Sequence, residues 1–306
     1  MNLKPSTHAS TDGFSAVEVL VAMTITSVFA AAALSIAFSS QGLLEADERR
    51  TTVNQNLRAG IDLLGIDIRQ AGERLPGDAP AIQIMDGSSG APDSLMLRRN
   101  QLDYVMPLCK NINAGSSADS VFVGKKKITG KVPPGCYPVP DANGDGWPDN
   151  LEAWRNYRIA NGGSVVAYIH NPITGLGEFF TYDAEDNSTF HLHKANGASW
   201  QHDYLMNEEP RIYILEQKEF RLLDGVLQCV INDDTSNALN LVSHIEDFQL
   251  QAIFTDGTVQ QSFGGTDDWI ELQSIEVALV GQIQGKDTRF ERTLVSRFFP
   301  RNILSN

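Results

Sequence analysis

The sequence predicts an α+β fold in which one long N-terminal helix precedes a region of antiparallel strands. Residues 14–38 are almost purely apolar, and residues 41–75 carry apolar side chains at steps of three and four. After Pro76 the pattern changes to short strand-like runs between clusters of Gly, Ser, Pro and Asp. We therefore expect a helix over 14–75, packed on an antiparallel sheet formed within 76–306.

The apolar stretch 14–38 is long enough to cross a bilayer as one helix, since about 20 residues span the hydrocarbon layer. One acid, Glu18, interrupts it near its start. A carboxylate in hydrocarbon is costly, so we expect Glu18 to have a function. Lys4 lies before the span, which favours a cytoplasmic N-terminus and places the chain after Phe38 outside the cytoplasm. The alternative is an ordinary signal-anchor helix with an incidental acid.

The second half of the predicted helix has a single apolar stripe, with polar residues on the opposite face. Pro76 and Gly77 end this pattern. The stripe consists of Val53, Leu57, Ile61, Leu64, Ile68, Ala71 and Leu75. One stripe of this kind indicates that the second half packs on the sheet.

The region 76–306 reads as a series of short strands. The pair Asp224-Gly225 between two apolar runs is the signal of a type I′ hairpin turn, and the alternation along 244–254 slips in phase near Glu246. The expected strands are 82–84, 95–98, 104–108, 120–124, 165–170, 178–182, 189–194, 211–222, 226–231, 244–254, 270–283 and 293–299.

Three cysteines lie in the part of the chain expected outside the cytoplasm, where disulfides persist. Cys109 and Cys136 flank a Gly/Ser/Lys-rich loop and are the expected pair, although the residue pattern alone leaves the pairing open. Closing that loop would contribute about 3 kcal/mol in the chain-entropy treatment. Cys229 lies in the apolar run 226–231, and we expect it to be a buried free thiol.

Residues 141–152 match the EF-hand calcium-loop pattern at every ligand position. The side-chain ligands would be Asp141, Asn143, Asp145, Asp149 (directly or through water) and a bidentate Glu152, with the backbone carbonyl of Trp147 and a sharp turn at Gly146. Ca²⁺ prefers about six to eight hard oxygens, and these acids would repel one another without a cation.

The loop departs from a paired calcium sensor in two ways. Pro148 replaces the aliphatic residue that joins two hands, and no helix pattern precedes Asp141, although one follows through Leu151, Trp154 and Tyr157. We therefore expect an isolated loop within an insertion at about 109–163, holding a structural calcium ion. The alternative is an acidic surface turn.

Composition and motifs exclude several classes of function. With a net charge of −14, the chain lacks the basic character that nucleic-acid binding requires. No nucleophile elbow, phosphate loop, paired zinc cysteines or acid–base dyad occurs, so we do not expect an enzyme.

His191 and His193 would share a strand face, with His202 nearby, and are interpreted as solvated histidines rather than a metal site. Asn187-Ser188-Thr189 matches a glycosylation sequon, a short pattern that is frequent by chance.

The N-terminal junction resembles the signal of type IV prepilins and type II secretion pseudopilins. In that signal a short polar leader ends in Gly, followed by Phe and, four residues later, Glu; here these are Gly13, Phe14 and Glu18. Near the other end, the runs IEDFQLQAIF, LQSIEVALVG and RTLVSRFFPRN resemble PilW-type minor pilins and, more distantly, the J-type minor pseudopilin. Together the two matches cover about 9–75 and 243–302.

The resemblance implies a pilin fold and a processing route. A prepilin peptidase would remove leader 1–13 after Gly13 and methylate Phe14, and Glu18 would pair with the N-terminal amine of a neighbouring subunit. The expected partners are other major and minor pilins, the inner-membrane assembly platform and the membrane. The expected locations are the bacterial inner membrane and the extracellular pilus.

The function implied is that of a minor pilin in the initiation of a type IV pilus, at its tip. Two alternatives remain at this point: a minor pseudopilin of type II secretion, and a calcium-dependent adhesin anchored by one helix. The second alternative predicts an unprocessed N-terminus.

Overall fold

The computed structural model describes residues 13, 15–127, 130–137, 139–264, 269, 271–285 and 289–302. The expected leader apart from Gly13, the expected methylation site Phe14, and Ile270 at the start of one expected strand lie outside these residues. The described chain is α+β, as predicted: a long N-terminal helix contacts antiparallel sheets.

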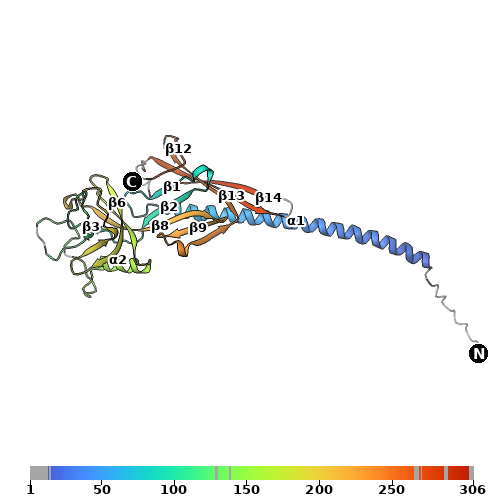
Figure 1. Cartoon of the computed structure of the whole chain (residues 1–306), viewed down its shortest axis with the longest axis horizontal. Helices are drawn as coiled ribbons and strands as arrows, with labels where there is room; N and C mark the ends of the chain where they lie inside the picture. Colours follow the sequence, from blue (N-terminus) through green and yellow to red (C-terminus); the bar gives the residue numbers. More distant parts are fainter. Residues whose placement is uncertain are drawn as a thin grey trace, which may run out of the picture.

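Helix α1 (Ala16–Gln70) contains 55 residues and extends far beyond the rest of the molecule (Figure 1). At 1.5 Å per residue it is about 80 Å long. Every described residue from Ser15 to Glu45 is exposed, so the apolar half has no partner within the chain. By length and composition this helix could cross a membrane.

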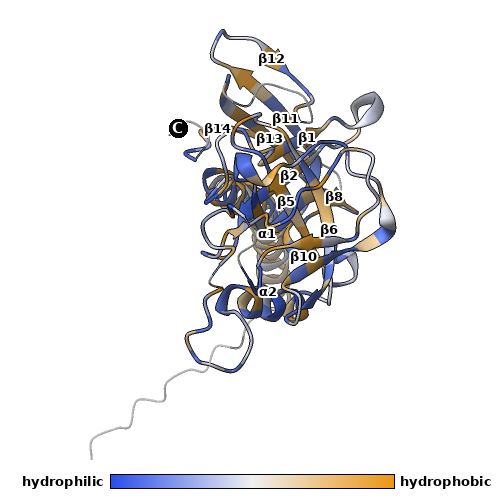
Figure 2. Ribbon diagram, turned by 90° about the vertical axis from the view of Figure 1, so that its left-hand side faces the viewer, coloured by the Kyte–Doolittle hydropathy of each residue, from blue (hydrophilic) through white to orange (hydrophobic). Residues whose placement is uncertain are grey.

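The second half of α1 buries the predicted stripe. Its buried residues are Val53, Leu57, Gly60, Ile61, Leu64, Gly65 and Ile68. They pack mainly on a four-stranded sheet of order β12-β11-β13-β14, and on β10 and β2. Viewed from the end of the molecule away from the N-terminus, β2, β11 and β13 carry hydrophobic stretches (Figure 2). We call this part the helix-bound lobe.

The helix-bound lobe contains most of the strands that follow α1 along the chain. They are β1 (Ile82–Met85), β2 (Ser94–Asn100), the second half of β8 (Arg211–Leu223), β9 (Val226–Ile231), β10 (Leu239–Ser243), β11 (Ile245–Phe254), β12 (Val259–Gln260), β13 (Leu272–Gln284) and β14 (Arg289–Phe298). An ion pair between Lys218 Nζ and Asp67 Oδ1, 2.6 Å apart, joins β8 to the helix.

Helix α1 ends at Gln70, before the Leu75 at which the apolar stripe ends. Gly72 has a φ of 77°, a left-handed conformation that ends the helix. Its N–H donates to the carbonyl of Arg98 on β2, and the Glu73 carbonyl accepts from the N–H of Asn100. Residues 71–75 therefore leave the helix because their backbone bonds to the neighbouring strand.

A second lobe, the distal lobe, is inserted between β2 and β8. It contains β3 (Met106–Pro107), β4 (Ser120–Phe122), α2 (Asp149–Ala160), β5 (Val165–His170), β6 (Gly177–Asp186) and β7 (His191–Lys194). It has its own hydrophobic core, in which Trp154, Trp200, Tyr182 and Tyr204 are the largest buried side chains. Short 3₁₀ helices occur at Ser88–Gly90, Ala195–Gly197, Met206–Glu208 and Thr235–Asn237.

Strand β8 belongs to both lobes. Its residues 211–214 pair with β3 and β5 in the distal lobe, and its residues 215–223 pair with β2 and β9 in the helix-bound lobe. The distal strands and β1, β2, β8, β9 and β10 of the helix-bound lobe thereby form one ten-stranded sheet, separate from the four-stranded sheet on α1. All described strand pairs of the ten-stranded sheet are antiparallel.

Most of the expected strands are confirmed. β5 and β9 have the predicted ranges, the Asp224-Gly225 turn has positive φ at both residues, and a register shift falls between Ile245 and Asp247, where the alternation slips. The pattern does not predict β10 and β12, because β10 is largely exposed and β12 is only two residues long. Expected strand 104–108 shortens to Met106–Pro107, in part because Pro107 has no N–H to donate.

The contact between α1 and β14 depends on a glycine. A Cβ at Gly65 would overlap the ring of Phe298, which cannot move aside as a flexible side chain would. We expect Gly65→Ala to lower the free energy of unfolding by about 1–3 kcal/mol, the usual cost of overpacking. Urea unfolding of the full chain in detergent measures this.

Gly42→Ala is the matched control, because Gly42 lies in the same helix and its Cβ would have nothing within 4 Å. If the two variants are equally stable, the contact between α1 at Gly65 and β14 at Phe298 is not as tight as described.

Candidate functional site

The N-terminal end of α1 holds the predicted processing and assembly residues. Gly13 is exposed, and nothing lies within 4 Å of the position its Cβ would take, so a peptidase could reach this bond. Ser15 caps the helix: its hydroxyl accepts from the Glu18 N–H at 3.2 Å, and Glu18 Oε2 accepts from the Ser15 N–H at 2.9 Å. This reciprocal capping box orients the Glu18 carboxylate toward the helix start.

The hydroxyls within the apolar half of α1 bond to the helix itself. Thr24, Thr26 and Ser27 donate to the carbonyls of Val21, Ala22 and Thr24, at 2.7–2.8 Å. Their polar groups therefore need no water, which suits a helix surrounded by lipid or by other apolar helices.

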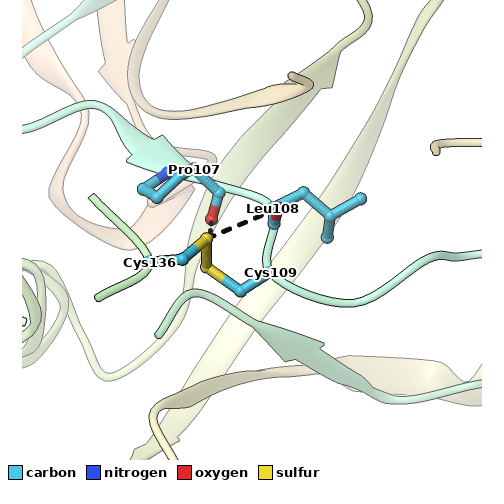
Figure 3. The surroundings of a disulfide bond; sticks show 4 residues. All are labelled: Pro107, Leu108, Cys109 and Cys136. Carbon is cyan, nitrogen blue, oxygen red and sulfur yellow. Dashed lines mark hydrogen bonds between the residues drawn. A yellow bond between two sulfur atoms is a disulfide. The ribbon is translucent and has the colours of Figure 1, made fainter. Parts of the chain in front are cut away.

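The distal lobe contains the expected disulfide. Cys109 and Cys136 are bonded, with their Cα atoms 5.7 Å apart (Figure 3). Their sulfur atoms lie 3.7 and 3.8 Å from the carbonyl oxygens of Pro107 and Leu108, respectively. Cys229 is a buried free cysteine, as predicted, and burial raises the pKa of its thiol to about 11. This thiol is therefore protonated and unreactive at neutral pH.

The acidic loop 141–152 precedes and enters α2, so the helix indicated after the loop is present. Gly144 and Gly146 have positive φ values of 73° and 89°, which the tight turns of the loop require. Its polar side chains accept from the loop's own backbone: Asp141 from the N–H groups of Gly144 and Gly146, and Asp149 from that of Ala142.

The remaining predicted ligands follow the same arrangement. Asn143 Oδ1 accepts from the Asp145 N–H at 3.1 Å, and Asp145 Oδ1 accepts from the Trp147 N–H at 2.8 Å. Glu152 lies on the first turn of α2. Across the residues that the structure describes, however, no group of three or more His, Cys, Asp or Glu side chains is close enough to hold a metal ion. The described loop thus has two glycines with positive φ and a helix after it, and its carboxylates are not gathered at one point.

A hairpin far away in the sequence supports this loop. The turn between β6 and β7 brings the Asn187 side chain to the Gly146 carbonyl, to which its amide donates at 3.3 Å. In the sequence, Asn187 stands out only as part of a glycosylation sequon. No local signal connects residue 187 to the acidic loop, because the contact depends on how β6 and β7 pair.

Glu185 on β6 holds α2 in place. Its carboxylate, only 4% exposed, accepts from Arg158 through two bonds of 2.9 and 3.0 Å and from the Tyr182 hydroxyl at 2.5 Å, and Arg155 lies 3.4 Å away. Hydrogen bonding to Glu185 raises the pKa of Arg158, and burial raises the pKa of Tyr182. The arginine is therefore charged and the tyrosine protonated at neutral pH.

The histidines singled out in the sequence are separate from the acidic loop. His193 contacts Asp183 at 2.5 Å and Asp119 at 3.6 Å, and His191 Nδ1 lies 2.6 Å from Thr189 Oγ1. His193 and Asp183 make a surface ion pair between β7 and β6 when the histidine is protonated.

Comparisons of this chain with protein-family models, with curated proteins and with solved structures find no match. The architecture, a long apolar N-terminal helix packed on antiparallel sheets, is consistent with a pilin-like fold.

Glu185→Ala is expected to destabilise the distal lobe by about 3–5 kcal/mol, because it removes a buried carboxylate and leaves Arg158, whose side chain is 13% exposed, without its ion-pair partner. Urea unfolding followed by tryptophan fluorescence measures this, since Trp154 and Trp200 lie in the distal core. As a control, Glu291→Ala removes a half-exposed ion pair with Arg289 and should cost about 0–1 kcal/mol. Equal losses in the two variants would show that Glu185 does not hold the lobe.

Proposed function

We propose that this protein is a minor pilin, held in the inner membrane by α1 and incorporated into a type IV pilus. The observation that carries this proposal is the division of α1 into two halves. One half is apolar and exposed from Ser15 to Glu45, and the other is packed against the sheets. An exposed apolar half that contains a single acid is suited to leave the lipid and pack among similar helices.

In this proposal Glu18 directs assembly. Cleavage after Gly13 by a prepilin peptidase frees the amine of Phe14, which is then methylated. The Glu18 carboxylate, held at the helix start by Ser15, pairs with that amine on a neighbouring subunit. Opposite charges attract far more strongly in an apolar filament core than in water, so the pair favours correct stacking.

The size of the head, residues 76–306, supports a place at the pilus tip. The distal lobe extends beyond the end of α1, on the side opposite the apolar half (Figure 1). A subunit of this bulk is easier to place at the end of a filament than throughout its shaft. Its partners would be other major and minor pilins and the inner-membrane assembly platform.

We further propose that the acidic loop binds a structural calcium ion. The side chains of Asp141, Asn143, Asp145, Asp149 and Glu152 and the carbonyl of Trp147 would hold it. Supporting this are the positive φ angles of Gly144 and Gly146 and the helix that begins at Asp149. Bound calcium would remove the repulsion among four carboxylates and fasten the loop to α2.

Glu18→Ala is expected to keep this protein out of pili. The amount of it in the sheared pilus fraction should fall by about tenfold or more, because an amine is left unpaired in an apolar core. Membrane insertion and cleavage should be unchanged, with a mature chain that begins at methylated Phe14 in mass spectrometry.

The matched control is Glu45→Ala, which removes an exposed helical acid beyond the apolar span. A purified chain that still begins with Met1 would exclude the pilin proposal. Deletion of the protein should abolish twitching and leave protein secretion intact; loss of secretion alone would instead assign it to type II secretion.

Calcium binding is expected at one site on the full chain, with a Kd of roughly 10⁻⁴–10⁻³ M, the range of extracellular calcium modules. Asp145→Ala should weaken it by about tenfold or more in isothermal titration calorimetry, since a direct ligand is lost. Asp256→Ala is the control, because Asp256 makes similar bonds in an exposed turn of the other lobe. Undiminished binding by Asp145→Ala would refute these ligands.

A further inference from the structure

A cleft of about 250 Å³ lies in the distal lobe where five separate segments meet. Its lining includes Asp103, Tyr104, Pro134, Asp149, Asn150 and Arg211. Drug-sized ligands occupy pockets of roughly 300–1,000 Å³, so this cleft suits a single ring-sized group. The role proposed for the protein in pilus assembly does not use this cleft.

Several polar groups in the cleft are available to a ligand. Among the described residues, the Tyr104 hydroxyl and the Asn150 amide nitrogen have no hydrogen-bond partner. Arg211 has only a long 3.4 Å contact from Nη2 to Glu209. The Asp103 carboxylate adds acceptors, whereas that of Asp149 already accepts from the Ala142 N–H and is one of the proposed calcium ligands. Donors and acceptors therefore converge on one small space.

The charges and the apolar surface indicate what kind of ligand fits. The charged side chains of the lining already have partners. Asp103 lies 3.1 Å from Arg74, and Arg211 lies 3.4 Å from Glu209. Asp149 belongs to the proposed calcium site, so the cleft attracts neither an anion nor a cation strongly. The Tyr104 side chain, with the residue 46% exposed, and Pro134 provide apolar surface beside the polar groups. A pyranose ring has both characters: an apolar C–H face that packs on an aromatic ring, and hydroxyls that both donate and accept.

The cleft is also held in shape before any ligand arrives. The buried Trp154 donates from Nε1 to the Tyr104 carbonyl at 2.9 Å, and the Cys109–Cys136 disulfide fixes the chain next to Pro134. Arg211 begins strand β8, where it pairs with Pro107 and His170. A preformed site loses little conformational entropy on binding, which matters for a weak ligand.

We propose that this cleft binds one pyranose ring of a neutral oligosaccharide. Tyr104 stacks on the sugar ring, and Asn150, Arg211 and Asp103 bond to its hydroxyls. The exposed head of the protein would thereby recognise a glycan.

Saturation-transfer difference NMR tests the proposal on the full chain, in calcium-containing buffer and a detergent without a sugar head group. The probes are lactose, maltotriose, cellotriose and chitotriose, with sialyllactose as an acidic comparison and a proline-rich peptide as a competitor. At least one neutral sugar should give signals from its ring protons.

Tyr104→Ala should reduce that signal by about fivefold or more, and Arg211→Gln should also reduce it. Tyr137→Ala is the matched control: Tyr137 is a similarly exposed tyrosine of the same lobe, 42% against 46%, and does not line the cleft. Thermal unfolding confirms that each variant is folded.

Four results would overturn the proposal. None of the neutral sugars gives a signal, or a signal survives both Tyr104→Ala and Arg211→Gln. Sialyllactose alone binds, which assigns an anion site. The proline-rich peptide binds through Tyr104 while no sugar does, which assigns a peptide site.

Discussion

Continuity of strand β8 is the constraint on which the arrangement of the two lobes depends. Ile212 and Ile214 pack into the distal core, and Phe220, on the same strand, packs into the core beside α1. Between them Leu215 contacts a small cluster with Ala79 and Tyr168. Because β8 has ladder partners in both lobes, its main-chain hydrogen bonds join the two lobes. The distal lobe is thereby attached at one end of a long helix.

This arrangement separates two kinds of chemistry along one molecule. The exposed half of α1 carries apolar surface and one capped acid, which suits association within lipid or a bundle of helices. The distal lobe instead carries a disulfide, an acidic loop and a mixed polar cleft. Disulfides persist outside the cytoplasm, where the proposed function places the head. The proposed assembly and recognition roles therefore use surfaces at opposite ends.

Local patterns predicted much of this structure because they report which side of an element is buried. Apolar residues recur every three or four positions from Val53 to Ile68, and this recurrence predicted the packed face of α1. The Asp224-Gly225 pair predicted a hairpin turn. The Cys109–Cys136 pair and the helix after the acidic loop were also predicted. The end of α1 was not, since Gly72 leaves the helix to bond to a strand that is distant in sequence.

By itself the sequence determined the apolar span with its single acid, the stripe on α1, the main strands and the form of the acidic loop. Each of these depends on residues within a few positions of one another. Only the tertiary structure decided that β8 joins two cores, that Asn187 supports the loop, and that Tyr104 and Arg211 line one cleft. Strand pairing brings these residues together across many tens of positions, and no short-range pattern encodes that pairing.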